Sequence, residues 1–238
     1  MRIKFISVLF AITCAFSVSA FALDTTTDIL FGGFYNYSNI FTGKIRNYET
    51  NSSADYKAAF HTEGAFFGFD KFFNSRPFGI YFRAALFMGT SSIKRTVGGN
   101  IEKIRDTASN SDMFLDLGGV YAFNFGNLSL NIAPALSLLS IDSENKEKQY
   151  VEHFGNTYYT YYDSTELFGF GITVDIYVKY RYKYLAITAG MASSFYPLTQ
   201  VSSSVTGSPR DTKAFNLRPY LAVGISFRKH ISYSAGGK

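Results

Sequence analysis

The sequence predicts an all-β fold, an eight-stranded antiparallel up-and-down barrel that crosses a membrane. Three observations lead to this prediction. Residues 166–180, ELFGFGITVDIYVKY, alternate between large apolar and small or polar side chains, the period of a strand with two unlike faces. Eight such segments can be found along the chain, joined by connections that alternate between short and long. Their polar face consists mostly of Gly, Ala, Ser and Thr, which suit a narrow interior.

The first 22 residues have the composition of a secretory signal peptide. A basic start and a largely apolar stretch precede an Ala-x-Ala cleavage site that ends at Ala22. Lipidation at Cys14 is the alternative, although the residues before it form a poor lipidation motif. We expect a cleaved signal peptide over residues 1–22 and a barrel over residues 23–238.

The composition of the remaining chain narrows its class. It contains no cysteine, so disulfide bonds cannot hold it together. Without the two basic residues of the signal peptide it has 21 basic and 18 acidic residues, a net charge of +3 that does not favour a nucleic-acid partner. No later stretch approaches 18 consecutive apolar residues, which argues against a membrane-spanning helix. A membrane location would therefore require a closed barrel.

The predicted strands are each roughly 10 to 14 residues long, enough for a tilted strand to cross the hydrocarbon. They are residues 29–38, 58–69, 78–89, 113–123, 128–140, 165–178, 184–195 and 214–227. Short connections at 70–77, 124–127 and 179–183 are expected at the periplasmic end, and long loops at 39–57, 90–112, 141–164 and 196–213 at the extracellular end. A soluble sandwich has no reason to sort its connections by length in this way.

The character of the polar face decides which side of each strand is outside. A soluble barrel would cover its polar outer face with Lys and Glu. Here that face carries small residues and isolated charges, so it is predicted to line the lumen, and the apolar face is predicted to meet lipid. The main soluble alternative, a lipocalin-type barrel, would normally carry a Gly-x-Trp signature, and the chain has no Trp.

Aromatic residues gather around the three short connections and at the end of the last strand. Such rings are typical of the girdle with which a barrel meets the membrane interface. The alternative is that aromatic residues, 18% of this chain, are simply common in strands. The expected girdle consists of Phe69, Phe72, Phe73, Phe78, Tyr121, Phe123, Phe125, Tyr180, Tyr182, Tyr184 and Phe227.

Taken together, these patterns resemble the small eight-stranded outer-membrane barrels of Gram-negative bacteria, the OmpA, OmpX and OmpW class. Leu221, Val223, Ile225 and Phe227 are similar to the terminal strand, ending in an aromatic residue, that the insertion machinery reads in these families. The residues after it, 228–238, depart from the usual pattern and are expected to extend the strand or to form a short periplasmic tail. The resemblance implies a bacterial outer-membrane protein.

Several charges fall on the predicted lumen face. If Phe69 pairs with Phe78 across the first turn, Glu63 lies next to Arg83 and the two form an ion pair. Such pairs could gate a narrow pore, or they could satisfy one another and plug the barrel, since an unpaired buried charge would cost several kcal/mol. The sequence names no partner for Asp175. The full set of lumen charges is Glu63, Arg83, Asp116, Asp175 and Arg218, with His61 nearby.

An enzyme is the sharpest alternative, because small barrels that remove or transfer lipid A acyl chains exist. Such chemistry needs a His with a Ser nucleophile or a similar partner at the outer rim. His61 and Glu63 could form an acid–base pair, but no serine is suitably spaced, and His153 and His230 fall in a loop and in the tail. We therefore expect no catalysis, no cofactor and no metal site.

The long loops hold the remaining candidates, which are Lys94, Arg95, Lys103, Arg105, Tyr158, Tyr159, Tyr161 and Tyr162. Exposed aromatic and Arg-rich loops resemble binding surfaces for host surface molecules. The alternative is that their basic residues bind lipopolysaccharide or the lipid surface. We predict a monomeric protein that acts in surface interaction or adhesion; a narrow pore or transporter for small ions or apolar solutes is the alternative.

Overall fold

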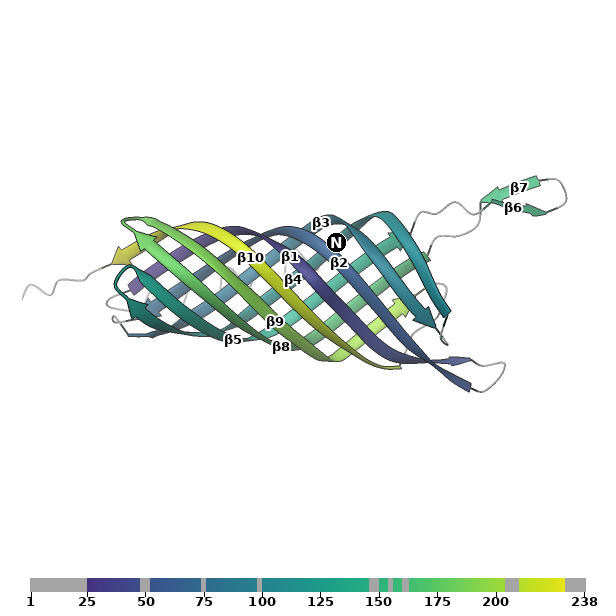
Figure 1. Cartoon of the computed structure of the whole chain (residues 1–238), viewed down its shortest axis with the longest axis horizontal. Coiled ribbons are helices and arrows are strands. Elements are labelled where there is room, and N and C mark those ends of the chain that lie inside the picture. The colour runs from purple at the N-terminus through teal and green to yellow at the C-terminus, as the bar shows by residue number, and fades with distance from the viewer. Residues whose placement is uncertain are drawn as a thin grey trace, which may run out of the picture.

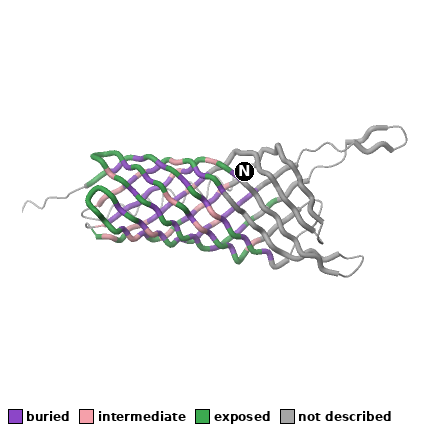
Figure 2. Tube along the Cα trace, in the orientation of Figure 1, coloured by how far each residue is buried: buried purple, intermediate pink, exposed green. Residues whose placement is uncertain are grey.

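A computed structural model of the chain describes residues 25–47, 52–73, 76–97, 100–145, 150–153, 156–159, 163–203 and 210–229. The signal peptide predicted for residues 1–22 and the tail beyond residue 229 lie outside the described residues. The burial of residues is described mainly in the half of the barrel that carries the short turns (Figure 2). Within the described residues, no helix is long and apolar enough to span a membrane.

Eight long strands close into an antiparallel barrel (Figure 1). The order around the barrel is β1-β10-β9-β8-β5-β4-β3-β2, so each strand pairs with its neighbours along the chain and β1 pairs with β10. A separate hairpin, β6–β7, lies beyond one end. The strands are β1 (Thr25–Asn47), β2 (Ser52–Phe73), β3 (Phe78–Val97), β4 (Asn100–Phe125), β5 (Leu128–Asn145), β6 (Tyr150–His153), β7 (Asn156–Tyr159), β8 (Asp163–Tyr182), β9 (Leu185–Ser203) and β10 (Arg210–Lys229). The predicted fold class is confirmed.

The two ends of the barrel differ. At one end, here called the short-turn end, brief turns join β2 to β3, β4 to β5 and β8 to β9 as predicted. At the other, the long-hairpin end, pairing continues much further than predicted, to Asn47↔Ser52 in β1–β2 and to Val97↔Asn100 in β3–β4. The prediction of long loops at 39–57 and 90–112 is therefore wrong for most of these residues. These segments are polar and lack the alternation that indicates a strand. They pair all the same, because the hydrogen bonds of the ladder join main-chain groups and do not depend on alternating side chains.

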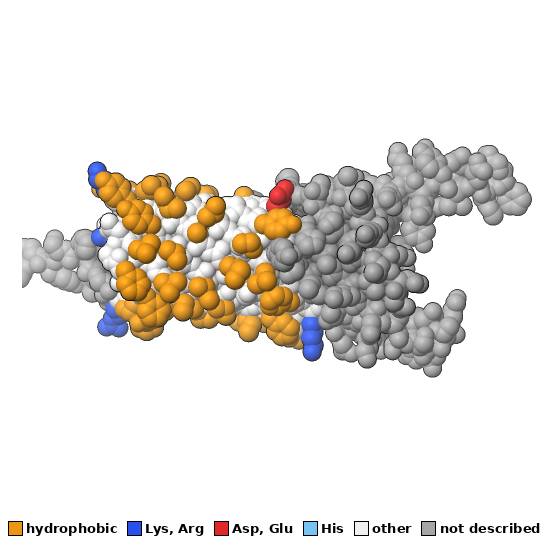
Figure 3. Space-filling model, in the orientation of Figure 1, with side chains coloured by type: hydrophobic (Ala, Val, Ile, Leu, Met, Phe, Trp, Pro, Cys, Tyr) orange, Lys and Arg blue, Asp and Glu red, His pale blue; other side chains and the backbone are white. Residues whose placement is uncertain are grey.

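The two faces of β8 have the predicted direction. In β8 the side chains of Phe168, Phe170, Ile172, Val174, Ile176 and Val178 are exposed, and the residues between them are buried. Exposed apolar side chains are spread over the whole described part of the outer surface seen in Figure 3. Soluble proteins rarely expose so large an apolar surface. An apolar outer band around a polar interior is the arrangement of a barrel whose outer solvent is lipid.

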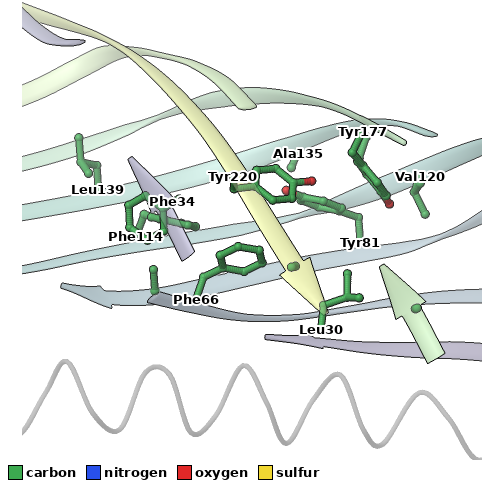
Figure 4. Close-up of a cluster of buried hydrophobic side chains, with 14 of the residues drawn as sticks. Leu30, Phe34, Phe66, Tyr81, Phe114, Val120, Ala135, Leu139, Tyr177 and Tyr220 are labelled. Carbon is green, nitrogen blue, oxygen red and sulfur yellow. The ribbon is translucent and has the colours of Figure 1, made fainter. Parts of the chain in front are cut away.

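The lumen is packed with side chains. Phe34 and Phe114 meet edge to face with ring centroids 5.4 Å apart, and Phe66 meets Tyr220 at 5.1 Å. These rings belong to a buried cluster with contributions from all eight strands of the barrel (Figure 4). An eight-stranded barrel has an interior just wide enough for such filling.

Close strand approach explains one glycine of the lumen face. A Cβ atom at Gly171 would lie 2.0 Å from the carbonyl oxygen of Phe195 on β9. The β8–β9 ladder has its register shift at this point, between Phe170 and Ile172. Only glycine therefore fits at this position without moving the backbone.

The predicted girdle residues do not all face outward. Phe73 and Tyr121 are partly exposed, and Phe78, Phe123, Phe125, Tyr180, Tyr182, Tyr184 and Phe227 are exposed near the short-turn end. Phe69 is buried and stacks on Phe82 at 5.1 Å. The placement of Phe72 in the girdle is wrong, because it shares the face of Asp70 and lies in the lumen cluster. Aromatic clustering near a turn does not reveal the face, which depends on strand register.

Candidate functional site

The predicted pair of Glu63 with Arg83 is wrong. Phe69 pairs with Phe82 rather than Phe78, so Arg83 lies opposite Gly68. Glu63 pairs with Tyr35 on β1, and both side chains are exposed, on the outer face. The prediction failed for two reasons. β2 runs on to Phe73, which changes its register with β3 by four residues, and the even-numbered residues of β2, such as Phe66 and Asp70, form its lumen face.

Arg83 instead begins a chain of ion pairs near the short-turn end. Its Nη1 lies 2.7 Å from Asp70 Oδ1, and Asp70 also binds Lys179. Lys179 Nζ lies 2.7 Å from Asp28 Oδ2, which in turn lies 2.7 Å from Arg181 Nη2. All but Arg181 are buried, and Arg181 is partly buried. Cations and carboxylates thus alternate along the chain, so each buried charge has a partner of opposite sign.

Asp175 accepts hydrogen bonds from two tyrosine hydroxyl groups inside the lumen. Tyr81 on β3 and Tyr220 on β10 each donate a hydrogen bond of 2.8 Å to Asp175 Oδ2. All three side chains are buried. The partners that the sequence could not name are therefore hydroxyl groups, which point to the carboxylate from two separate walls of the barrel.

A third cluster centres on Asp116 and Arg218. Arg218 Nη2 lies 2.6 Å from Asp116 Oδ2 and donates to Ser194 Oγ at 3.1 Å. Ser137 donates to Asp116 and shares a 2.9 Å hydrogen bond with the Tyr196 hydroxyl. The Arg218 guanidinium also lies 3.7 Å from the ring centroid of Phe114, a cation–π contact.

Two of these ion pairs join opposite walls of the barrel. Three strands separate β4 from β10 in either direction around the barrel, and the same holds for β2 and β8. The Asp116–Arg218 and Asp70–Lys179 pairs therefore cross the lumen at two levels. A cavity between the clusters, lined by Arg83, Asp175, Arg218 and neighbouring rings, has a volume of about 10 Å³, room for about one water molecule.

Sequence reasoning missed four charged residues of this network. Asp70, Lys179 and Arg181 fall in the predicted short connections, and Asp28 precedes the first predicted strand. The signal that could have found them is the alternation of β8, which continues through Tyr177 into residues 179 and 181 on the buried face. Charged residues at the end of a predicted strand resemble turn residues, and only the continued two-residue alternation shows that the strand extends through them.

The predicted loop residues lie at the long-hairpin end. Lys94 and Lys103 are opposite each other in the β3–β4 ladder, and Arg95 and Arg105 lie in the same hairpin. Tyr158 and Tyr159 belong to β7. Tyr161, Tyr162 and His230 lie outside the described residues, as do the side chains of the loop candidates and of His61. Among the described residues, no group of His, Cys, Asp and Glu could hold a metal ion.

Comparison with known proteins gives similarity of fold. No known protein family and no curated protein matches the sequence. Among solved structures, the chain is similar to Ail, the attachment invasion locus protein of Yersinia pestis, in complex with the heparin analogue sucrose octasulfate (TM-score 0.41, 12% identity, 85% of this chain and 99% of that chain). It is similar to Neisserial surface protein A (TM-score 0.42, 9% identity, 84% of this chain and 96% of that chain). It is also similar to the outer membrane protease OmpT from Escherichia coli (TM-score 0.47, 9% identity, 87% of this chain and 97% of that chain).

Proposed function

We propose that this chain is a non-enzymatic protein of the bacterial outer membrane, in which a filled barrel holds an interaction surface at its long-hairpin end. The apolar outer band supports the membrane location. The observation that carries the proposal is the pair of cross-lumen ion bridges, Asp116–Arg218 and Asp70–Lys179. A solute crossing the lumen would have to break both, and each buried charge left alone would be costly.

Bilayer recording tests the closed lumen. We expect the refolded protein to give no steady single-channel current in a planar bilayer. The Asp116→Ala/Arg218→Ala double variant removes one bridge and leaves the Asp70–Lys179 bridge, so it should also stay closed. Glu63→Ala serves as the control, because Glu63 lies outside the lumen. Stable currents from the unaltered protein would favour the alternative function, a narrow pore or transporter.

The interaction surface is assigned to the hairpins at the long-hairpin end. The β3–β4 extension carries Lys94, Arg95, Lys103 and Arg105 within one ladder. Basic residues in one hairpin attract anionic surfaces, either of host molecules or of lipopolysaccharide. We assign these two classes as partners of a monomeric barrel that is exported by its signal peptide.

Binding assays on bacteria that display the barrel test this surface. Replacing the four basic residues by Ala should weaken binding to immobilised host matrix proteins, and the remaining binding should depend less on salt. Deleting residues 150–159 separately tests the β6–β7 hairpin. Binding to purified lipopolysaccharide, measured with the same variants, distinguishes the two partner classes. Unchanged binding in both assays would exclude these hairpins as the interaction surface, and altered lipid A acyl chains would contradict the non-enzymatic assignment.

A further inference from the structure

The lumen opens at the short-turn end into a wider cavity. Its volume is about 230 Å³, and its lining comes from the ends of β1, β2, β4, β8 and β10 and from the adjoining turns. Three of the lining residues are arginines, Arg76, Arg181 and Arg228, and no residue of the lining is acidic. The mouth of the barrel at this end is therefore a water-accessible space with three guanidinium groups around it.

One of these arginines is held in place by the lumen network. Arg181 donates from Nη2 and Nε to Asp28 Oδ2 at 2.7 and 3.1 Å, and its guanidinium lies 5.5 Å from the ring centroid of Phe72. Asp28 is shared with Lys179, so its single negative charge is already matched by a deeper cation. Arg181 thus forms an ordered, cationic floor for the cavity, with little side-chain entropy left to lose on binding a ligand.

The other two arginines stand at the rim. Arg76 follows β2 in the turn before β3, and Arg228 lies near the end of β10. Both are exposed, and neither forms an ion pair with any residue that the structure describes. Three cations that converge on one cavity without a carboxylate in its lining create a positive potential, which concentrates anions there.

We propose that this mouth binds a small oxyanion of the phosphate class from the short-turn side of the membrane. The planar fork of an arginine fits phosphate oxygens in pairs, which a lysine cannot do. Three positive charges favour a doubly charged phosphate over a singly charged carboxylate. A cavity of about 230 Å³ has room for a phosphate group together with several waters, since a cavity of about 10–15 Å³ on the same measure already holds one water. The phosphate can belong to a free solute or to a lipid head group.

Equilibrium dialysis with labelled inorganic phosphate tests the site on the full chain, refolded in phosphate-free maltoside micelles at low salt. Arg76→Ala and Arg228→Ala should each weaken binding by about tenfold, and the double variant should abolish it. Lys183→Ala is the matched control, because Lys183 is an exposed cation on the β8–β9 turn, over the ring of Tyr182 and outside the cavity lining. Gel mobility before and after heating verifies that each variant is folded.

The same assay in vesicles identifies the source of the phosphate. If a head group is the natural ligand, anionic phospholipid vesicles should compete with labelled phosphate, whereas vesicles of neutral lipid with attached sugars should not. If a free solute is the ligand, binding should be equal in both. The proposal is overturned if the unaltered protein binds no phosphate, or if folded Arg76→Ala and Arg228→Ala bind it no more weakly than Lys183→Ala does.

Discussion

Arg218 on β10 bonds to Asp116 on β4 across the full width of the barrel, with Nη2 2.6 Å from Oδ2. The two residues are 102 positions apart in the chain, and three strands separate them in either direction around the barrel. The ring of Phe114 covers the guanidinium, and Ser194 accepts a second hydrogen bond from it. The contact therefore ties two opposite walls together in a lumen filled with buried side chains.

Removing one partner of this pair should be strongly destabilising. Arg218→Ala leaves the Asp116 carboxylate buried without its cation, which we expect to lower the free energy of unfolding by about 3–5 kcal/mol. Urea unfolding of the barrel in lipid vesicles measures this loss. In a double-mutant cycle, Asp116→Ala/Arg218→Ala should lose less than the sum of the two single variants. Additive losses would show that the pair does not couple the walls.

Lys179 should be the most sensitive lysine of the short-turn end. It binds both Asp28 and Asp70, so Lys179→Met leaves two buried carboxylates with one cation fewer. We expect a loss of about 3–5 kcal/mol in the same unfolding assay. Lys183→Met, on the exposed turn nearby, should change stability by less than about 0.5 kcal/mol. Equal effects of the two substitutions would contradict the buried network.

Asp175 should matter as an acceptor of hydrogen bonds. Asp175→Ala leaves the hydroxyl groups of Tyr81 and Tyr220 without their acceptor, which should lower the free energy of unfolding by about 1–3 kcal/mol for each. Asp175→Asn keeps one acceptor oxygen and should lose less. Adding Tyr81→Phe and Tyr220→Phe to Asp175→Ala should recover part of the stability in urea unfolding, because neither hydroxyl group is then buried without an acceptor. No recovery would mean that the hydroxyl groups find other acceptors.

Gly171 should not tolerate a side chain. Gly171→Ala would place a Cβ atom 2.0 Å from the Phe195 carbonyl oxygen, so the β8–β9 ladder must shift. We expect a clearly reduced folded fraction, seen as the heat-sensitive band on a gel. Gly33→Ala is the control, because its nearest contact would be an ordinary 3.8 Å to the Gly64 carbonyl oxygen. A fully folded Gly171→Ala variant would show that the backbone of β8 and β9 can move apart to admit the Cβ atom.

The lipid-facing surface should respond to charge according to depth. Val174 is exposed on β8 in the middle of the apolar band, and Val174→Arg should cost about 2–4 kcal/mol in lipid vesicles. Tyr182→Arg, at the short-turn end of the same strand, should cost about 0–1 kcal/mol. A small effect at both positions would indicate that this face of the barrel does not meet the hydrocarbon.

Features that depend on residues close together in the chain could be predicted from the sequence, and features that depend on how strands pair could not. The alternation in β8 and the short turns depend on neighbouring residues, so they could be predicted. The pairing of Glu63 with Arg83 failed on register, which depends on how far β2 continues past Phe69, and also on the choice of face, because the irregular alternation of β2 does not show which residues line the lumen. The placement of Phe72 in the girdle failed on the choice of face, since Phe72 shares the lumen face of β2 with Phe66 and Asp70.

The sequence by itself determined the closed eight-stranded architecture, the apolar outer face and the burial of Asp175, because periodicity and side-chain size are local properties. Only the tertiary structure decided which charges meet. Closure of the barrel brings Lys179 to Asp28 and Asp70, and Arg218 to Asp116, from strands that are distant in the chain. It also gathers Arg76, Arg181 and Arg228 around one mouth. Such meetings depend on strand order, tilt and register together, and these become fixed only when β1 pairs with β10.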